Sequence, residues 1–310
     1  MWKLIFIINK LTNYCKKENT RFIISGSGIG SVICGIVAMR LNIRHYRLIG
    51  CSLKQVEKTL FKFYKVFRID SLIDGYFGWP AVFLEIQEKG VSKLKCFELN
   101  AAVDTKIFYP LKSKKITDFR EKLGINSNEI VIGWIGRVAE NMQVGNTVIL
   151  GRELIKLGFT SFKILIVGGG PWLNSLRKIT SNLGLDNYTI FSDWVPMNQV
   201  NSYINSMDVI PLLEQDPHGG SILRESMSCG KVTISVDGPS KVQRDFMKPS
   251  FSILLKGNDF IKEAAKTIIR LSSDPEIRKT MGKKARLYCK KHLSFNSQAK
   301  SIQKVLDESI

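Results

Sequence analysis

Residues 208–230 read DVIPLLEQDPHGGSILRESMSCG, and this stretch indicates the fold more clearly than any other part of the sequence. It opens with a short apolar run that is typical of a buried strand. It continues through a polar turn with two adjacent glycines and becomes helical from about Ser221. Joints of this kind, from strand through glycine turn to helix, occur throughout α/β proteins.

The turn in this stretch has the chemistry of an anion site. Helix N-termini present backbone N–H groups without helical partners and the positive end of the helix dipole, so they hold phosphate well. Gly219 and Gly220 let a ligand approach the backbone with no Cβ in the way. Glu225, four residues into the helix, would accept hydrogen bonds from a ribose beside this site. The stretch predicts a nucleotide or nucleotide-sugar pocket, although most such joints bind nothing.

Strands and helices alternate from about residue 111 onward. The predicted helices cover residues 115–123, 141–157, 173–183 and 197–206, and the predicted strands cover residues 130–134, 163–167, 188–191 and 232–236. This alternation predicts a parallel, doubly wound sheet, whose ligands bind outside the carboxyl ends of the strands. Four loops that follow strands should therefore meet at one edge: Gly136-Arg137, the glycines at 168–170, Trp194-Val195 and the Gly219 turn.

Residues 22–39 carry no charge and are as long as the shortest membrane-spanning helix. Glycines cluster in their first half, however, and would break a helix near its start. A strand at 21–25, a glycine turn and a helix at 31–41 fit better, so we expect a buried α/β unit. The turn is no dinucleotide fingerprint, because Ser31 stands where that motif requires glycine.

The basic surplus is concentrated near the start of the chain. The formal net charge is +19, and residues 1–68 hold 13 Lys or Arg against two acids. Within them, residues 53–68 place five cations on one side of a predicted helix and apolar residues on the other. Such a helix suits an anionic membrane surface, where each cation contributes about 1 kcal/mol. A core-packing helix with a solvated basic face is at least as common. Nucleic acid is not expected as a partner, because no motif that reads it is visible.

The number and spacing of the cysteines and histidines bear on whether the protein has disulfides or a metal site. The six cysteines include no CxxC pair, and the three histidines lie far apart with no metal-ligand spacing. We therefore expect reduced thiols, a cytoplasmic location, no bound metal and no cofactor. The apolar run Leu4 to Ile8 is too short for a signal peptide and lacks a cleavage site.

A family resemblance adds to this reading. The order GWIGRVAEN, ILIVGGGP, FSDWVP, SMDVIPLL, GGSILRESMSCGKVTISVDG and SSDPEIRKTMGKKARLYCKKHLSF resembles the C-terminal half of GT-B glycosyltransferases. It is most similar to the retaining group called glycosyltransferase family 4, or group 1. LNAAVDTKIFYP resembles the linker between the two Rossmann-like domains of that family.

The resemblance implies a domain organisation and a reaction. Residues 1–110, joined by a final helix at 294–310, would form a shortened acceptor-side domain. Residues 111–293 would bind the nucleotide-sugar donor. The implied enzyme is a metal-independent, hexosyltransferase-like glycosyltransferase that acts on a sugar, polysaccharide or lipid-linked acceptor.

The resemblance also implies roles for single residues. Arg137, which follows Gly136, would neutralise the donor diphosphate as it leaves. Glu225 would hold the ribose, and the amides of Gly220, Ser221 and Ile222 would cradle the diphosphate. Trp194 and Val195 would contact the base, and His218, beside Gly219, would contact the sugar.

Two positions depart from the family pattern. Met142 stands where the family has a second diphosphate-binding lysine, and Pro217 stands where it has the first glutamate of a Glu-x7-Glu motif. Asp216 could replace that glutamate in a shifted turn, and Lys231 or Lys241 could supply the missing cation. His45 matches no catalytic motif, and a lone histidine is more often structural.

These observations predict a retaining glycosyltransferase at the cytoplasmic face of a membrane, attached through residues 53–68. Met142 and Pro217 motivate an alternative of another class: a degraded, non-catalytic GT-B module that binds a nucleotide or a partner protein.

Overall fold

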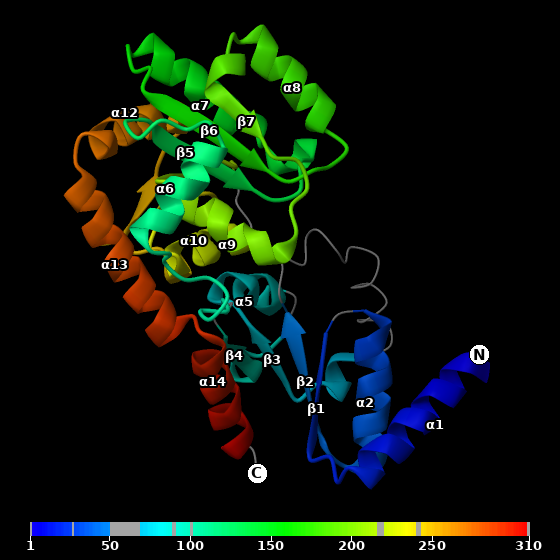
Figure 1. Ribbon diagram of the computed structural model, residues 1–310. Coiled ribbons are helices and arrows are strands. Elements are labelled where there is room, and N and C mark those ends of the chain that lie inside the picture. Colours follow the sequence, from blue (N-terminus) through cyan, green and yellow to red (C-terminus); the bar gives the residue numbers. More distant parts are fainter. Residues whose placement is uncertain are drawn as a thin grey trace. The chain divides into compact units, whose positions relative to one another are not determined.

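The computed structural model describes residues 2–26, 28–49, 69–88, 91–99, 102–215, 220–239 and 243–308. The chain divides into two compact units (Figure 1). The first unit contains Met1–Ala101 and Ser301–Ile310, and the second contains Ala102–Lys300. The predicted basic helix at 53–68 lies outside the described residues, as do residues 216–219.

The second unit is built on a six-stranded parallel sheet with strand order β10-β9-β8-β5-β6-β7. Its strands are β5 (Ile130–Ile135), β6 (Phe162–Val167), β7 (Thr189–Phe191), β8 (Val209–Leu212), β9 (Val232–Val236) and β10 (Ser252–Leu255). Strands β5 and β6 read IVIGWI and FKILIV. Such runs are apolar almost throughout because both faces of a parallel sheet are covered by helices.

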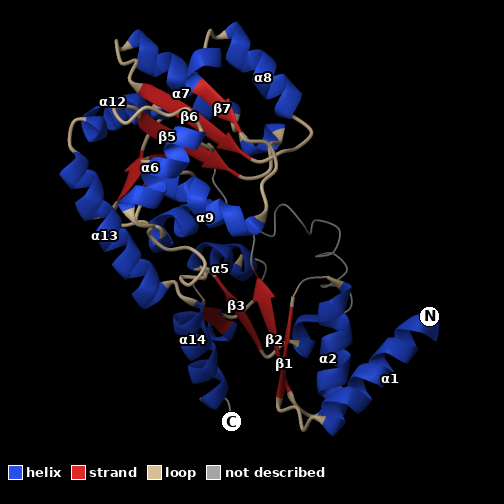
Figure 2. Cartoon of the chain, in the orientation of Figure 1, coloured by secondary structure: helices blue, strands red, loops and turns tan. Residues whose placement is uncertain are grey.

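Helices cover both faces of this sheet (Figure 2). They are α6 (Ser113–Lys122), α7 (Gly145–Lys156), α8 (Leu173–Asn182), α9 (Met197–Ser206), α10 (Ser221–Ser228), α11 (Gln243–Phe246), α12 (Phe260–Ser272) and α13 (Pro275–His292). Alternate residues of β5 enter opposite cores. Ile132 packs with Leu154 of α7 on one face, and Val131 packs in the cluster that contains Leu223 of α10 on the other.

The first unit has a four-stranded parallel sheet with strand order β1-β2-β3-β4. Its strands are β1 (Phe22–Ser25), β2 (Arg44–Ile49), β3 (Gly75–Gly78) and β4 (Cys96–Glu98), and its helices are α1 (Trp2–Lys17), α2 (Ile29–Leu41) and α5 (Pro80–Gln87). The last helix, α14 (Phe295–Asp307), ends in this unit. Its Leu306 packs with Tyr46, Phe77 and Leu99.

The boundary between the units falls at residues 101/102, earlier than the predicted 110/111. Val103 already belongs to the second unit, because its N–H donates to the Leu293 carbonyl at 2.7 Å. Phe108 is likewise buried in the second unit's core. The return to the first unit falls at residues 300/301, within α14, where we expected it at 293/294.

Two parallel-sheet, Rossmann-like units confirm the predicted α/β fold class. The uncharged run at 22–39 contains β1 and most of α2. Within the described part of the chain no helix is long and apolar enough to cross a membrane. The start of one helix was predicted four residues too early. The helix expected at 141–157 begins only at Gly145, because Gln143 adopts a left-handed conformation with φ 48°.

Candidate functional site

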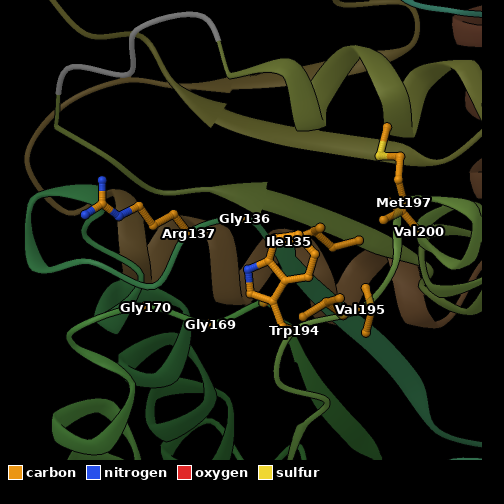
Figure 3. Close-up of a pocket in the computed structure, with 11 residues that line it drawn as sticks. Ile135, Gly136, Arg137, Gly169, Gly170, Trp194, Val195, Met197 and Val200 are labelled. Carbon is orange, nitrogen blue, oxygen red and sulfur yellow. The ribbon is translucent and has the colours of Figure 1, made fainter.

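A pocket of about 670 Å³ lies at the carboxyl edge of the second unit's sheet (Figure 3). It is lined by residues that follow three neighbouring strands and by the first turn of α9: Ile135, Gly136, Arg137, Val167, Gly168, Gly169, Gly170, Trp194, Val195, Met197 and Val200. Its volume is within the range of small-molecule sites. Four predicted site residues, Gly136, Arg137, Trp194 and Val195, therefore do lie together.

Glycines let the turns after β5 and β6 pack backbone to backbone. Gly168 has φ +126°, and a Cβ there would lie 2.0 Å from the Gly136 carbonyl oxygen. A Cβ on Gly170 would lie 2.2 Å from the carbonyl oxygen of Val138. The N–H of Val138 in turn donates to the Gly169 carbonyl at 2.9 Å. The wall of the pocket is thus continuous hydrogen-bonded backbone that leaves no room for side chains at these positions.

Trp194 brings a large apolar surface to this wall. Its side chain is 80% exposed, and its Cδ1 lies 3.3 Å from where a Cβ on Gly169 would be. Figure 3 shows the indole beside Ile135 and Val195. A flat aromatic ring held against glycine backbone offers one face to a planar ligand such as a base.

An ion pair between Arg177 and Asp193 fixes the turn that carries Trp194, and the sequence did not reveal this pair. The Arg177 guanidinium on α8 donates to the Asp193 carboxylate at 2.6 Å and lies 4.5 Å from the Phe191 ring centroid. Asp193 has φ 54°, and its carbonyl accepts from the Gly168 N–H at 2.8 Å. The only local signal would have been an aspartate just before an exposed tryptophan.

Arg137 is exposed, and its side chain extends away from Trp194 along the same edge (Figure 3). It follows β5, whose parallel neighbour β8 pairs through Ile132 and Val209. Because parallel neighbours end at the same edge, Arg137 and the start of α10, which follows β8, lie at that edge too. Among the described residues, the pocket lining includes Arg137 but none of Gly220, Ser221, Ile222 and Glu225.

The loop after β5 is braced against the end of β8. The Asn146 side-chain amide donates to the Leu213 carbonyl at 2.6 Å, and the Gln143 side-chain oxygen accepts from the Gln215 N–H at 3.1 Å. This brace connects the loop that holds Arg137 to the strand end that precedes α10. Sequence reasoning missed it, because both contacts join residues about seventy positions apart.

The start of α10 has the backbone geometry expected of an anion site. Gly220 precedes the helix and has no side chain with which to cap it, so it leaves the N–H groups of the first turn uncapped. Ile222 is 9% exposed and packs in the core. Its side chain therefore faces away from any ligand, and only its amide could serve one.

Glu225 is half-buried, one turn into α10. Burial raises the pKa of its carboxyl, while the neighbouring Arg224 and a hydrogen bond from the Ser221 side chain oppose that rise. The bond from Ser221 shows that the carboxylate is directed toward the start of the helix. The ribose-binding role of Glu225 stays a prediction.

The structure describes two of the other residues that the sequence analysis named, Met142 and His45, and neither lines the pocket. His218, Gly219, Pro217 and Lys241 lie outside the described residues. Met142 is half-buried, and its side chain packs against the core. His45 is fully buried in the first unit, where its ring nitrogens contact Ser25 Oγ at 2.8 Å and the Leu72 carbonyl at 2.7 Å.

Lys231 does not replace the missing diphosphate cation, which corrects our expectation. It precedes β9 and so lies at the opposite edge of the parallel sheet from Arg137. Its ammonium donates to the Asn205 carbonyl at 2.6 Å. Burial lowers the pKa of Lys231 to about 8, and the nearby Asp208 partly offsets the effect.

Among the side chains that the structure describes, no group of three or more His, Cys, Asp and Glu residues could hold a metal ion. The groups that the site presents are a guanidinium, backbone amides, an indole and a carboxylate. They are suited to binding an anionic ligand with a planar ring and hydroxyl groups.

Comparison with known proteins identifies the family. The sequence model of the glycosyl transferases group 1 matches residues 115–288, more than half of the chain. The chain therefore belongs to the glycosyl transferases group 1 and is a transferase. The matched region contains the residues that line the pocket, α10 and all six strands of the second unit's sheet.

Individual proteins agree with this assignment. An uncharacterized glycosyltransferase of Methanocaldococcus jannaschii is 23% identical over all of this chain and 79% of its own length. The Anabaena protein HepE, solved in complex with UDP, superposes with a TM-score of 0.84 at 14% identity, over 97% of this chain and 82% of HepE. A glycosyltransferase from Rickettsia africae superposes with a TM-score of 0.81 at 16% identity, over 98% of this chain and 81% of the other. These solved structures share the fold, which is the GT-B arrangement.

Proposed function

We propose that the protein transfers a hexose from a nucleoside-diphosphate sugar to an acceptor hydroxyl, with retention of configuration and without a metal ion. The observation that carries this proposal is the convergence of Arg137, the Trp194 turn and the start of α10 on one edge of the sheet. HepE has been solved with UDP and with UDP-glucose, which supports a nucleotide-sugar as the donor.

In the proposed reaction, the bond between the sugar C1 and the donor diphosphate breaks while a bond from C1 to the acceptor oxygen forms on the same face. The acceptor proton passes to the departing phosphate oxygen. Negative charge grows on the diphosphate as it leaves. The Arg137 guanidinium and the amides of Ser221 and Ile222 stabilise that charge, and preorganised donors of this kind contribute several kcal/mol.

The other two groups fix the nucleoside. Trp194 stacks on the base, and Glu225 accepts hydrogen bonds from the ribose hydroxyls. Partial burial strengthens each of these hydrogen bonds, because competing water is excluded. Neither group touches the reacting bond, so both act mainly on donor affinity.

The acceptor is proposed to be a sugar, a polysaccharide or a lipid-linked glycan. An alpha-monoglucosyldiacylglycerol synthase of Streptococcus pneumoniae is 22% identical over 42% of this chain and 29% of its own length, and its name describes a lipid product. A cytoplasmic location and attachment to the inner face of the membrane through residues 53–68 remain part of the proposal.

Calorimetric titration with UDP, GDP and ADP tests the donor site. We expect one diphosphate to bind, and we expect Arg137→Ala to weaken it at least about tenfold, since hydrogen bonds to charged groups contribute about 1.5–3 kcal/mol. Arg270→Ala, an exposed arginine on α12, is the matched control and should leave the dissociation constant unchanged. Equal affinities of Arg137→Ala and the wild type would disprove the assignment of Arg137.

Turnover separates the proposal from its alternative, the non-catalytic module that Met142 and the half-buried packing of its side chain favour. An enzyme should hydrolyse its donor slowly in the absence of acceptor, and a chelator should not change that rate. A module should bind the diphosphate and release no sugar over many hours. The anomeric configuration of the released or transferred sugar, read by NMR, then tests retention.

A further inference from the structure

Helix α1 is packed along only part of its surface. Ile8 and Cys15 are buried in a cluster with Val37 of α2, and Leu11 is half-buried against the same cluster. These three positions fall on one side of the helix. They account for the attachment of α1 to the first unit, and the rest of its surface is exposed.

The first two turns of α1 carry five exposed apolar side chains and one exposed cation, Lys3, and they are exposed in nearly every direction. The exposed fractions of the apolar residues in these two turns are Trp2 84%, Leu4 41%, Ile5 44%, Phe6 67% and Ile7 48%. Figure 1 shows this end of α1 extending beyond α2, away from the sheet of its unit. Seven helical residues rise by about 10 Å, so the exposed apolar part is roughly that long.

Cations occur along the whole of α1: Lys3 lies within the apolar end, Lys10 lies about one turn beyond it, and Lys16 and Lys17 lie in the last turn. Lys10, Lys16 and Lys17 are exposed, and α1 contains no acidic side chain. The exposed Arg40 of α2 lies against the same helix, where its guanidinium donates to the Asn9 side chain at 2.9 Å. An apolar end on a helix whose charged side chains are all cationic is complementary to a surface with anionic groups outside and hydrocarbon beneath.

We propose that α1 inserts its first two turns into the interface of an anionic lipid bilayer. An apolar end about 10 Å long is far too short to span the hydrocarbon core of about 30 Å, so it would reach only the interface and the upper acyl chains. Trp2, at the tip of the helix, would enter first and reach the upper acyl chains, and the long side chains of Lys3 and Lys10 would extend toward the lipid phosphates.

The distribution of the apolar residues favours lipid over a protein partner. Successive residues of a helix point about 100° apart, so Leu4, Ile5, Phe6 and Ile7 face four different directions. A protein groove covers one side of a helix and would leave the others in water. A fluid bilayer surrounds the inserted end on all sides. This inference does not depend on the proposed transfer reaction.

Co-sedimentation with vesicles tests the proposal directly. The full chain should bind vesicles that contain phosphatidylglycerol at least tenfold more tightly than vesicles of phosphatidylcholine alone, and high salt should reduce the difference. The double variant Trp2→Ser/Phe6→Ser should lose at least tenfold in affinity. Leu94→Ser is the matched control, because Leu94 is 89% exposed in the same unit and should not contribute.

Brominated lipids locate the inserted residue. Bromine in the upper acyl chain should quench fluorescence of the wild-type protein, and Trp2→Phe should lose that quenching while still binding vesicles. Unchanged binding of Trp2→Ser/Phe6→Ser would overturn the proposal. So would a concentration-dependent dimer that this variant converts to monomer, because the apolar end would then serve a second copy. Nucleotide titration of the same variants shows separately whether the donor site is intact.

Discussion

Replacing Lys231 by methionine should remove a pH-dependent cost to stability. The Lys231 side chain is half-buried at the edge of the sheet opposite Arg137, its ammonium donates to the Asn205 carbonyl, and burial lowers its pKa from 10.5 to about 8. The folded state therefore disfavours the charged form. A pKa shift of this size lowers the free energy of unfolding by about 3 kcal/mol at pH below 8. This figure is an upper bound, because water still reaches part of the side chain.

The sign of the pH dependence follows from proton binding. Between pH 8 and 10.5 the unfolded chain binds more protons at Lys231 than the folded chain, so the free energy of unfolding rises with pH. From pH 8 to 9 the rise from this group is about 1 kcal/mol. The buried thiols of Cys229 and Cys289, whose pKa values burial raises to about 12, act in the opposite direction above pH 9.

Urea unfolding of the wild type and Lys231→Met, measured in steps from pH 7.5 to 9.5, isolates the effect. Lys231 lowers the pKa of Cys229 somewhat, but both folded-state thiols stay protonated over this pH range with or without Lys231, so their contribution nearly cancels in the difference. The stability advantage of Lys231→Met should shrink by about 1 kcal/mol between pH 8 and 9. Lys283→Met, on the exposed side of α13, should show no such change. A difference that stays constant over this range would refute the assignment of the buried ammonium.

Four further substitutions test the donor site. Gly170→Ala forces a Cβ to within 2.2 Å of the Val138 carbonyl oxygen and should lower stability by about 1–3 kcal/mol and weaken diphosphate binding, as thermal melts and calorimetry would show. Glu225→Gln should raise the unfolding free energy at pH 7–8, because burial disfavours the carboxylate, yet weaken nucleotide binding by roughly tenfold or more; equal affinity would remove the ribose role. Arg177→Ala removes an exposed ion pair and should cost less than about 1 kcal/mol in stability, but should raise the nucleotide dissociation constant severalfold with kcat unchanged. Met142→Lys should tighten UDP binding about tenfold in a salt-sensitive way, whereas Met142→Leu should not.

Local signals were enough to predict the second unit's sheet. β5, β6 and β9 are short apolar runs, each followed by glycine or a polar turn, and their order along the chain gives a parallel sheet almost directly. The same reasoning failed for β2, which reads RHYRLI. His45 is 0% exposed and Arg47 2%, so polar side chains occupy positions where a buried strand usually has apolar ones. His45 is accommodated by Ser25 and by the Leu72 carbonyl, and neither partner is visible in the local sequence.

Some features of the candidate site were likewise predictable from local sequence, and others depend on contacts between distant residues. The loops that build it were predictable, because each follows a strand and parallel strands end together. The brace formed by Gln143 and Asn146 was not predictable, since it depends on contacts with residues 213–215. For the same reason the helix expected from residue 141 begins at Gly145. Gln143 leaves helical geometry and uses its side chain to bind the chain beyond β8.

The contacts of Gln143 and Asn146 show what the segment around Met142 does in this chain, which the residue type at position 142 could not show. In this chain the segment 140–146 contributes an apolar side chain to the core and two amide side chains to the end of β8. It therefore holds the end of β8 in register with the loop that carries Arg137, and Met142 adds no cation there. If the donor site is active, stabilisation of the leaving diphosphate rests mainly on the Arg137 guanidinium and the α10 amides. The rate should then depend on guanidinium geometry as well as charge, so that Arg137→Lys lowers kcat far more than it raises KM.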